Sequence, residues 1–246
     1  MQAQTLQGLF ITGTDTGVGK TFVAAAIVKT LKCRKTRVGA LKPVATGATR
    51  EGPSWRAEDA ESLIAALGCG VETRRVTPLV YEEPLAPCVA AQRAGTPLFH
   101  ADLLAAVTEA LTWWSDRANL MIVEGVGGLL CPLAADSTVA DLAIALDYPL
   151  IIVAHRGLGT LNHTLLTVEA ATRRGLRLAG VVLNGAKPTV DPIAEETNPG
   201  ELVRHLQNVP LLAELPHGLT VDDLNRRLDI VDWQGLAKGP RRIGTT

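Results

Sequence analysis

The sequence predicts an α/β fold, a single domain in which a doubly wound, mostly parallel sheet carries helices on both faces. Short β-branched apolar runs alternate along the chain with longer segments of helical spacing, which is the order expected when helices cover a parallel sheet. The apolar runs are nearly continuous, as in Leu-Ile-Ile-Val at positions 150–153, and such runs favour strands that are buried on both faces. No repeat interrupts this order, so one domain is sufficient to explain it.

The predicted elements can be placed in order along the chain. Strands are predicted at Gly8–Thr12, Val38–Pro43, Leu120–Glu124, Leu150–Ala154, Gly180–Leu183 and Pro210–Glu214. Helices are predicted between them, at Lys20–Leu31, Ala57–Ala66, Ala101–Trp114, Thr138–Leu146, Leu161–Arg174 and Gly200–Leu206. Three prolines and many polar residues predict an exposed loop over Lys187–Pro199. We expect the domain to span residues 1–234 and the tail at 235–246 to fray.

The composition is typical of a soluble enzyme and excludes several other classes. Of the 246 residues, 47% are hydrophobic and 20% charged, so disorder is not expected over most of the chain. The net charge of −1 and the 4% of aromatic residues argue against a partner that is a nucleic acid. We recognise no C-x-x-C pair, secretory signal or membrane span, and therefore expect a reducing, cytoplasmic location and no membrane partner.

The first strand leads into a glycine-rich loop, Gly-Thr-Asp-Thr-Gly-Val-Gly-Lys-Thr at 13–21, which opens the first helix. Backbone N–H groups of such a loop, together with the helix N-terminus, bind phosphate, so the pattern indicates a P-loop NTPase. Lys20 is expected to reach the β- and γ-phosphates and Thr21 to ligate Mg²⁺. Five residues separate Gly13 from Gly19, whereas the general motif has four. The alternative interpretation is therefore a glycine-rich turn that is capped by Thr16 and binds no ligand.

The second strand ends in Lys-Pro-Val-Ala-Thr-Gly at 42–47. Ligands bind at the carboxyl ends of parallel strands, so Lys42 is a candidate catalytic cation and Thr46 supplies a hydroxyl nearby. The alternative is a solvated lysine at a strand end.

Two acidic residues are candidates for the metal side. Glu124 ends an apolar strand, where a magnesium-directed carboxylate is expected, and Asp59 lies at the start of a predicted helix. Both could instead cap local structure, and Glu124 is the stronger candidate. Asn162 could cap a helix or contact a ligand, and the sequence does not favour either role. Asn184-Gly185 could likewise form a turn or contact a purine.

Taken together, these segments resemble dethiobiotin synthetase, the ATP-dependent carboxylase of biotin biosynthesis. The resemblance runs from about Leu9 to Pro216 and is carried by these motifs: Gly13–Thr21 with its five-residue spacing, Lys42–Gly47, Glu83–Pro87, Glu124–Gly128, Gly157–His163 and Pro210–Pro216. Two positions depart from the pattern, because Gly17 stands where some members carry Glu and Thr46 where many carry Ser.

The resemblance implies a function and a set of site residues. The substrates would be ATP, 7,8-diaminononanoate and CO₂ or bicarbonate, with Mg²⁺ as cofactor and a homodimer as the assembly. The catalytic residues implied are Lys42, Lys20 and Thr16, the metal ligands Thr21, Asp59 and Glu124, and the substrate-binding residues Thr46, Lys42, Gly159, Thr160, Leu161 and Asn162. The nucleotide-binding residues implied are Gly17, Val18, Gly19, Lys20, Thr21, Phe22, Asp59, Glu124, Gly125, Val126, Gly127, Asn184, Gly185, Pro216, His217 and Gly218.

Two alternatives use the same scaffold. An amidoligase acting on cobyrinic acid usually adds a glutamine amidotransferase domain, for which 246 residues leave no room. A positioning ATPase of chromosome or septum placement typically has a lysine earlier in the loop, where this chain has Gly13-Thr14-Asp15.

Overall fold

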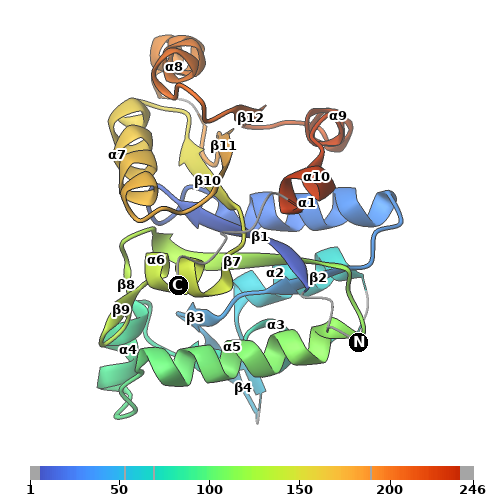
Figure 1. Ribbon diagram of the computed structural model, residues 1–246, viewed down its shortest axis with the longest axis vertical. Coiled ribbons are helices and arrows are strands. Elements are labelled where there is room, and N and C mark those ends of the chain that lie inside the picture. The colour runs from blue at the N-terminus through green and yellow to red at the C-terminus, as the bar shows by residue number, and fades with distance from the viewer. Residues whose placement is uncertain (1–5, 53, 69, 189, 239–246) are drawn as a thin grey trace, which may run out of the picture.

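A computed structural model describes residues 6–52, 54–68, 70–188 and 190–238, and its centre is a six-stranded parallel sheet (Figure 1). The strand order is β12-β11-β10-β1-β7-β2. The strands are β1 Gln7–Gly13, β2 Val38–Leu41, β7 Leu120–Gly128, β10 Leu150–His155, β11 Leu178–Asn184 and β12 Leu211–Leu215. All six predicted strands and the predicted fold class are therefore confirmed.

The strands are buried because both faces of the sheet are covered. Phe10 of β1 pairs with Leu150 of β10 on one side and with Val123 of β7 on the other, and all three side chains are fully buried. Since every strand runs in the same direction, the carboxyl ends of β1, β2, β7, β10, β11 and β12 meet at one edge of the sheet. Open α/β sheets bind ligands at this edge.

Helices lie in two layers (Figure 1). Helices α1 Lys20–Cys33, α2 Glu58–Leu67, α9 Val221–Asp229 and α10 Trp233–Ala237 pack together along one face. Helices α6 Val139–Leu146, α7 Thr160–Arg173 and α8 Pro192–His205 lie along the other face, and α5 His100–Ser115 lies beyond β2. The six predicted helices are confirmed, although α8 begins eight residues earlier than expected, at Pro192 rather than Gly200.

Several short elements were not predicted. They are β3 Val44–Thr46 with its parallel partner β6 Leu79–Tyr81, the hairpins β4 Thr49–Glu51 with β5 Ser54–Arg56 and β8 Pro132–Ala134 with β9 Ser137–Thr138, and the helices α3 Thr73–Val76, α4 Pro87–Arg93, α9 and α10. These strands have two or three residues each, which is too short for a two-residue period to be recognised.

One sequence-based expectation is wrong, and a second falls mostly outside the described residues. The loop expected over Lys187–Pro199 is helical from Pro192 onward, because proline is accepted in the first turn and the Asp191 side chain caps the helix by accepting from the Ala194 N–H at 3.1 Å. The tail expected from residue 235 starts within α10, which ends at Ala237, so its first three residues are helical and the rest of this expectation stays a prediction. Residues 239–246 lie outside the described part of the chain.

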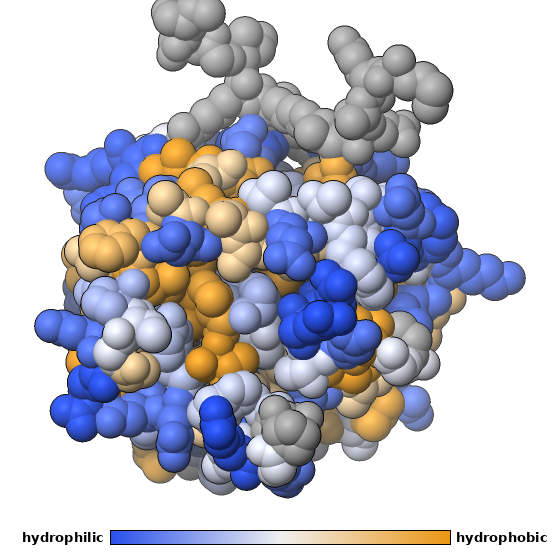
Figure 2. All heavy atoms as spheres, turned by 90° about the horizontal axis from the view of Figure 1, so that it is seen from below, coloured by the Kyte–Doolittle hydropathy of each residue, from blue (hydrophilic) through white to orange (hydrophobic). Residues whose placement is uncertain are grey.

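Seen from below, the molecule shows hydrophilic residues around much of its rim, with apolar residues in separate patches at the upper left, centre and lower right of the view (Figure 2). Apolar surface of this limited kind is usual on folded proteins. Among the described residues, no helix combines the length and apolar composition needed to cross a lipid bilayer.

Candidate active site

The glycine-rich loop connects β1 to α1 at the ligand-binding edge of the sheet. Gly17 and Gly19 have φ angles of 77° and 88°, a left-handed conformation that glycine adopts without strain. Lys20, the first residue of α1, is only 6% exposed, and its Nζ donates to the carbonyl of Asp15 at 3.0 Å. The lysine therefore folds back over its own loop, as a phosphate-binding lysine must.

Strand β11 holds this loop from the opposite side. The Nδ2 of Asn184 donates to the carbonyl of Val18 at 2.9 Å. A Cβ atom on Gly19 would lie 2.1 Å from the same Nδ2, so only glycine fits there. Asn184, predicted to touch the purine, thus also positions the phosphate loop.

Lys42 is a buried charged group at the centre of the site. Its side chain is 2% exposed, and Nζ lies 2.6 Å from Glu124 Oε1, 2.8 Å from Asp59 Oδ2 and 3.1 Å from the Gly125 carbonyl. The Glu124 side chain is fully buried, whereas that of Asp59 is 44% exposed. The structure therefore brings the predicted catalytic lysine and both predicted metal-side carboxylates together.

Thr21 completes this cluster. Its hydroxyl oxygen lies 2.8 Å from Asp59 Oδ1 and 2.8 Å from Glu124 Oε1, and it donates to one of them at a time. The second carboxylate oxygen of Glu124 is buried and, within the described residues, has no hydrogen-bond partner. An unpartnered carboxylate oxygen beside a hydroxyl and a second carboxylate fits Mg²⁺, which prefers oxygen ligands and keeps several waters.

The charges of the site shift one another's pKa values. Burial, followed by the charge of Lys42, lowers the pKa of Lys20 to about 8. Burial also acts to lower the pKa of Lys42, but the carboxylates of Glu124 and Asp59 outweigh it and the pKa is raised. Burial acts to raise the pKa of Asp59, but Lys42 outweighs it and the pKa is lowered, whereas burial prevails at Glu124 and raises its pKa.

A cleft of about 630 Å³ opens onto this cluster. It is lined by Thr16, Gly17, Gly19, Lys20, Thr21, Lys42, Thr46, Asp59, Pro84–Pro87, Glu124, Val126, Gly127 and Cys131. Most of the predicted catalytic, metal and phosphate-side residues thus share one cleft. Sequence reasoning did not assign Pro84–Pro87 or Cys131 to the site. Pro84 packs under Gly47, where an added Cβ would lie 3.2 Å from the proline Cβ, but only the family resemblance had marked this segment.

A second cleft, of about 600 Å³, lies on the other side of the phosphate loop, between Asp15–Val18, the turn after β10 and the turn after β11. Thr16 and Gly17 line both clefts. Asn184 and Gly185 are in this second cleft, and His217 Nδ1 lies 3.1 Å from the Gly185 carbonyl. The predicted adenine-side segments after β11 and β12 are therefore neighbours.

The predicted substrate segment Gly159–Asn162 does not line the cleft around Lys42. Gly159 precedes α7 with a φ of 90°, and Asn162 is exposed on the first turn of that helix. Thr160 is fully buried, with its hydroxyl 3.4 Å from that of Thr164. Within this chain the Thr160 side chain supports the start of the helix, and a substrate contact of this residue stays a prediction.

Phe22 also lies outside both clefts. Its side chain is 49% exposed on α1. Gly125 follows Glu124 in β7 and is tightly packed. An added Cβ on Gly125 would lie 2.9 Å from Val139 Cγ1, and the Gly125 carbonyl accepts from Lys42.

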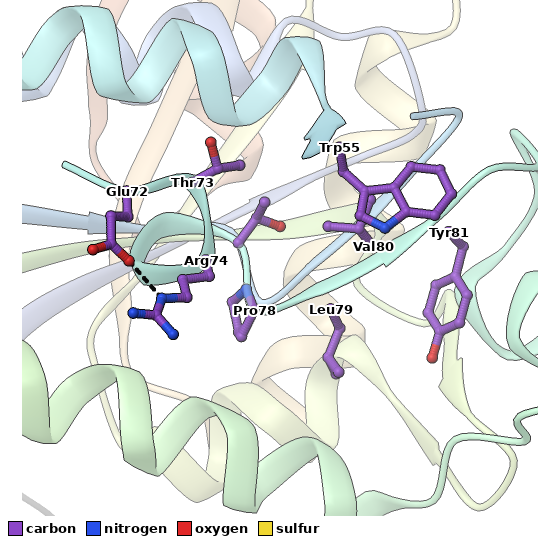
Figure 3. A pocket seen from close by; sticks show the side chains of 9 residues that line it. Trp55, Glu72, Thr73, Arg74, Pro78, Leu79, Val80 and Tyr81 are labelled. Carbon is purple, nitrogen blue, oxygen red and sulfur yellow. Dashed lines mark hydrogen bonds and ion pairs between the residues drawn. The ribbon is translucent and has the colours of Figure 1, made fainter. Parts of the chain in front are cut away.

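A third cleft, of about 720 Å³, lies away from these residues (Figure 3). Figure 3 shows Trp55 and Tyr81 at one end and the Glu72–Arg74 ion pair at the other, with Pro78, Leu79 and Val80 between them. None of the predicted site residues lines it, so it is separate from the candidate active site.

Comparisons with known proteins find relatives that match this chain over most of its length. A protein-family profile described as "AAA domain" matches residues 7–224. The chain is 45% identical over 207 residues to the ATP-dependent dethiobiotin synthetase BioD of Anaeromyxobacter dehalogenans (strain 2CP-C), covering 84% of this chain and 88% of that one. It is 40% identical over 216 residues to the ATP-dependent dethiobiotin synthetase BioD of Bacillus licheniformis, with 86% of each chain covered.

Solved structures show a weaker likeness. The Pyrococcus furiosus cell division ATPase MinD is 20% identical with a TM-score of 0.48, over 90% of this chain and 88% of that chain.

Proposed function

The chain belongs to the ATP-dependent dethiobiotin synthetases, and we propose that its active site is the cleft in which Lys42 lies between Asp59 and Glu124 and beside Lys20. The enzyme is a ligase that forms C–N bonds. One amine of 7,8-diaminononanoate takes up CO₂ as a carbamate, and the γ-phosphate of ATP is transferred to a carbamate oxygen. The second amine then displaces phosphate and closes the cyclic urea, which yields dethiobiotin, ADP and phosphate.

The two lysines are proposed to stabilise the phosphoryl transfer. Such a transfer needs little covalent chemistry from the protein and depends on positioned cations over the phosphate oxygens. Lys20 and the N–H groups of Gly17–Gly19 would bind the β- and γ-phosphates, while Lys42 would bridge the γ-phosphate and the carbamate. Thr16 and Thr46 line the same cleft and would donate to these anions.

Thr21, Asp59 and Glu124 are proposed to hold Mg²⁺. Support comes from their close contacts and from the buried Glu124 oxygen that has no partner among the described residues. The ion would supply positive charge to the phosphate oxygens in the transition state. Lys42 at present donates to both carboxylates, so this ammonium would be freed for the substrate when the carboxylates take a metal.

The nucleotide is proposed to run from the phosphate loop towards the turns after β11 and β12. Asn184, Gly185 and Pro216–Gly218 would then surround the adenine. The support is the contact between His217 and the Gly185 carbonyl, which holds the two turns together.

A homodimer is proposed, in which Gly159–Asn162 reaches the diamino acid bound to the neighbouring subunit. The exposure of Asn162 at the start of α7, outside the cleft of its own chain, supports this placement. Subunit complementation tests it, because a mixture of Lys42→Ala and Asn162→Ala chains would contain heterodimers with one intact composite site. In an equal mixture, half of the dimers are expected to be heterodimers, and each heterodimer carries one intact site out of two. About a quarter of the natural activity should therefore be recovered. Heterodimers without activity would refute the proposed contact between Gly159–Asn162 and the neighbouring subunit's substrate.

A cytoplasmic location is also proposed. It rests on the absence of a C-x-x-C pair in the sequence and on Cys33, Cys88 and Cys131 being free thiols in the described chain. Such cysteine usage is typical of a reducing compartment.

The contact of Lys42 with two carboxylates, beside a phosphate loop, is the observation that carries the proposed site. The test is mass spectrometry of the product made from ATP, bicarbonate and 7,8-diaminononanoate. The natural protein should form dethiobiotin only when all three are present, and Lys42→Ala should form almost none while still binding ATP. Natural turnover by folded Lys42→Ala would refute the site.

A further inference from the structure

The turn between β10 and α7, residues 156–159, is held by a side chain from a different part of the fold. The Nδ2 of Asn198, in the middle of α8, donates to the carbonyl of Arg156 at 2.8 Å and to that of Gly157 at 3.1 Å. Asn198 is only 6% exposed. A buried amide whose two protons both meet carbonyls of one turn limits the positions that the turn can take.

Arg156 makes the reciprocal contact, from the turn to α8. Its guanidinium lies 3.3 Å from Glu195 Oε2, 3.1 Å from the Glu195 carbonyl and 3.5 Å from Glu214 Oε2 of β12. Only 13% of the Arg156 side chain is exposed. Two acidic side chains thus balance a largely buried cation, and the same guanidinium fork satisfies a main-chain carbonyl.

A proline explains why that carbonyl is free. In a helix the carbonyl of Glu195 would accept from the N–H of residue 199, but residue 199 is a proline inside α8 and has no N–H. Arg156 supplies the missing donor. Asn198 and Pro199 together therefore make a docking point for the turn: one donates to its carbonyls and the other leaves an acceptor for its arginine.

The turn is well placed to affect ligand binding. It leads directly into the proposed substrate segment, because its last residue, Gly159, precedes α7, and its Leu158 side chain is 78% exposed. We propose that Asn198 is a positioning residue, which acts through Arg156 and Gly157 to set the place of Gly159–Asn162 and thereby the binding of the diamino acid. This inference rests on the proposed contact between that segment and the diamino acid.

Steady-state kinetics of Asn198→Ala and Asn198→Asp test the inference. Both variants lack the two donated bonds, so the KM for 7,8-diaminononanoate should rise about tenfold. The KM for ATP and kcat should stay within about twofold, because the phosphate loop and Lys42 keep their own contacts. The matched control is Thr197→Ala, since this neighbouring hydroxyl donates at 2.9 Å to Ile193 of its own helix, and its KM should be unchanged. Amide hydrogen exchange at residues 156–160 should be faster in the Asn198 variants and unchanged in the control.

Pro199→Ala tests the same inference in a chain that should fold at least as well. The new N–H would satisfy the Glu195 carbonyl and compete with Arg156, so the KM for the diamino acid should rise while Tm does not fall. If the Asn198 variants do not fold, the KM of Pro199→Ala for the diamino acid tests the positioning role instead. An unchanged KM for the diamino acid in the folded variants, or an equal rise in the KM for ATP, would overturn the positioning role. Absence of dethiobiotin formation by the natural protein would instead overturn the proposed site.

Discussion

Replacement of Lys20 by methionine should stabilise the ligand-free protein at neutral pH, although it removes a residue that we place on the phosphates of ATP. The lysine is 6% exposed, and burial, followed by the charge of Lys42, lowers its pKa from 10.5 to about 8. That difference corresponds to about 3 kcal/mol, because each pKa unit is worth about 1.4 kcal/mol. Methionine has a similar length and no charge, so the free energy of unfolding should increase by an amount of this order.

The dependence on pH follows from the protons bound by the two states. Between pH 8 and 10.5 the unfolded chain retains the Lys20 proton that the folded chain has lost, so the stability of the natural protein rises with pH in this window. Below pH 8 both states are protonated and the full penalty is present. The advantage of the methionine variant should therefore be about 3 kcal/mol at pH 7 and approach zero near pH 10.5.

Urea unfolding, followed by tryptophan fluorescence at pH 7, 8.5 and 10, measures this advantage. Lys29→Met is the matched control, since Lys29 is exposed on the same helix, and its stability should follow that of the natural protein at every pH. Isothermal titration should show that Lys20→Met binds ATP far more weakly. A methionine variant that is no more stable at pH 7, or whose advantage does not change with pH, would refute the reasoning.

Three further outcomes are expected. Lys42→Met should lose about 3–5 kcal/mol of stability as well as activity, because it leaves the Glu124 carboxylate buried without its cation. Urea unfolding should show that the double variant with Glu124→Gln regains most of the lost stability. A Lys42→Met variant as stable as the natural protein would contradict this explanation. Gly19→Ala, whose Cβ would lie 2.1 Å from Asn184 Nδ2 at a φ of 88°, should lower Tm and weaken ATP binding in a titration. In its control Gly52→Ala, at a φ of 62°, the added Cβ meets no described atom within 4 Å beyond Gly52 and its chain neighbours. This control should cost only about 1 kcal/mol of backbone strain and leave ATP binding intact. Chelation by EDTA should abolish dethiobiotin formation without changing the far-UV circular dichroism, and added Mg²⁺ should restore it; chelator-resistant turnover would argue against the metal.

The central strands could be predicted because burial on both faces demands continuous apolar residues, and positions 150–153 show such a run. The pair β3 and β6 could not, because each strand has three residues and exists only beside a partner some 35 positions away, as in Val44 with Leu79. The first half of α8, up to Pro199, is predicted as a loop because three prolines and many polar residues favour an exposed connection. The compensating donor, Arg156, comes from another strand end, and no local pattern indicates it.

The site residues show the same difference between those that a local sequence pattern indicates and those that it does not. Lys20, Lys42 and Glu124 could be predicted because each follows or ends a recognisable strand, and the edge where parallel strands end is shared. Cys131 and the contact between Asn184 and Val18 could not be predicted from the residues alone, since they depend on the order of strands within the sheet. Local patterns identify residues that carry the chemistry, whereas the residues that position them require the three-dimensional arrangement.

The four innermost charges of the cleft, Lys20, Lys42, Asp59 and Glu124, have a formal sum of zero, and the whole chain has a net charge of −1. An arrangement of this kind produces little long-range field, so it does not guide an approaching anion by electrostatic steering. The rate constant for association of the nucleotide should consequently vary little with ionic strength. Discrimination for a triphosphate would then arise after encounter, when short-range contacts form inside the cleft and slow its dissociation.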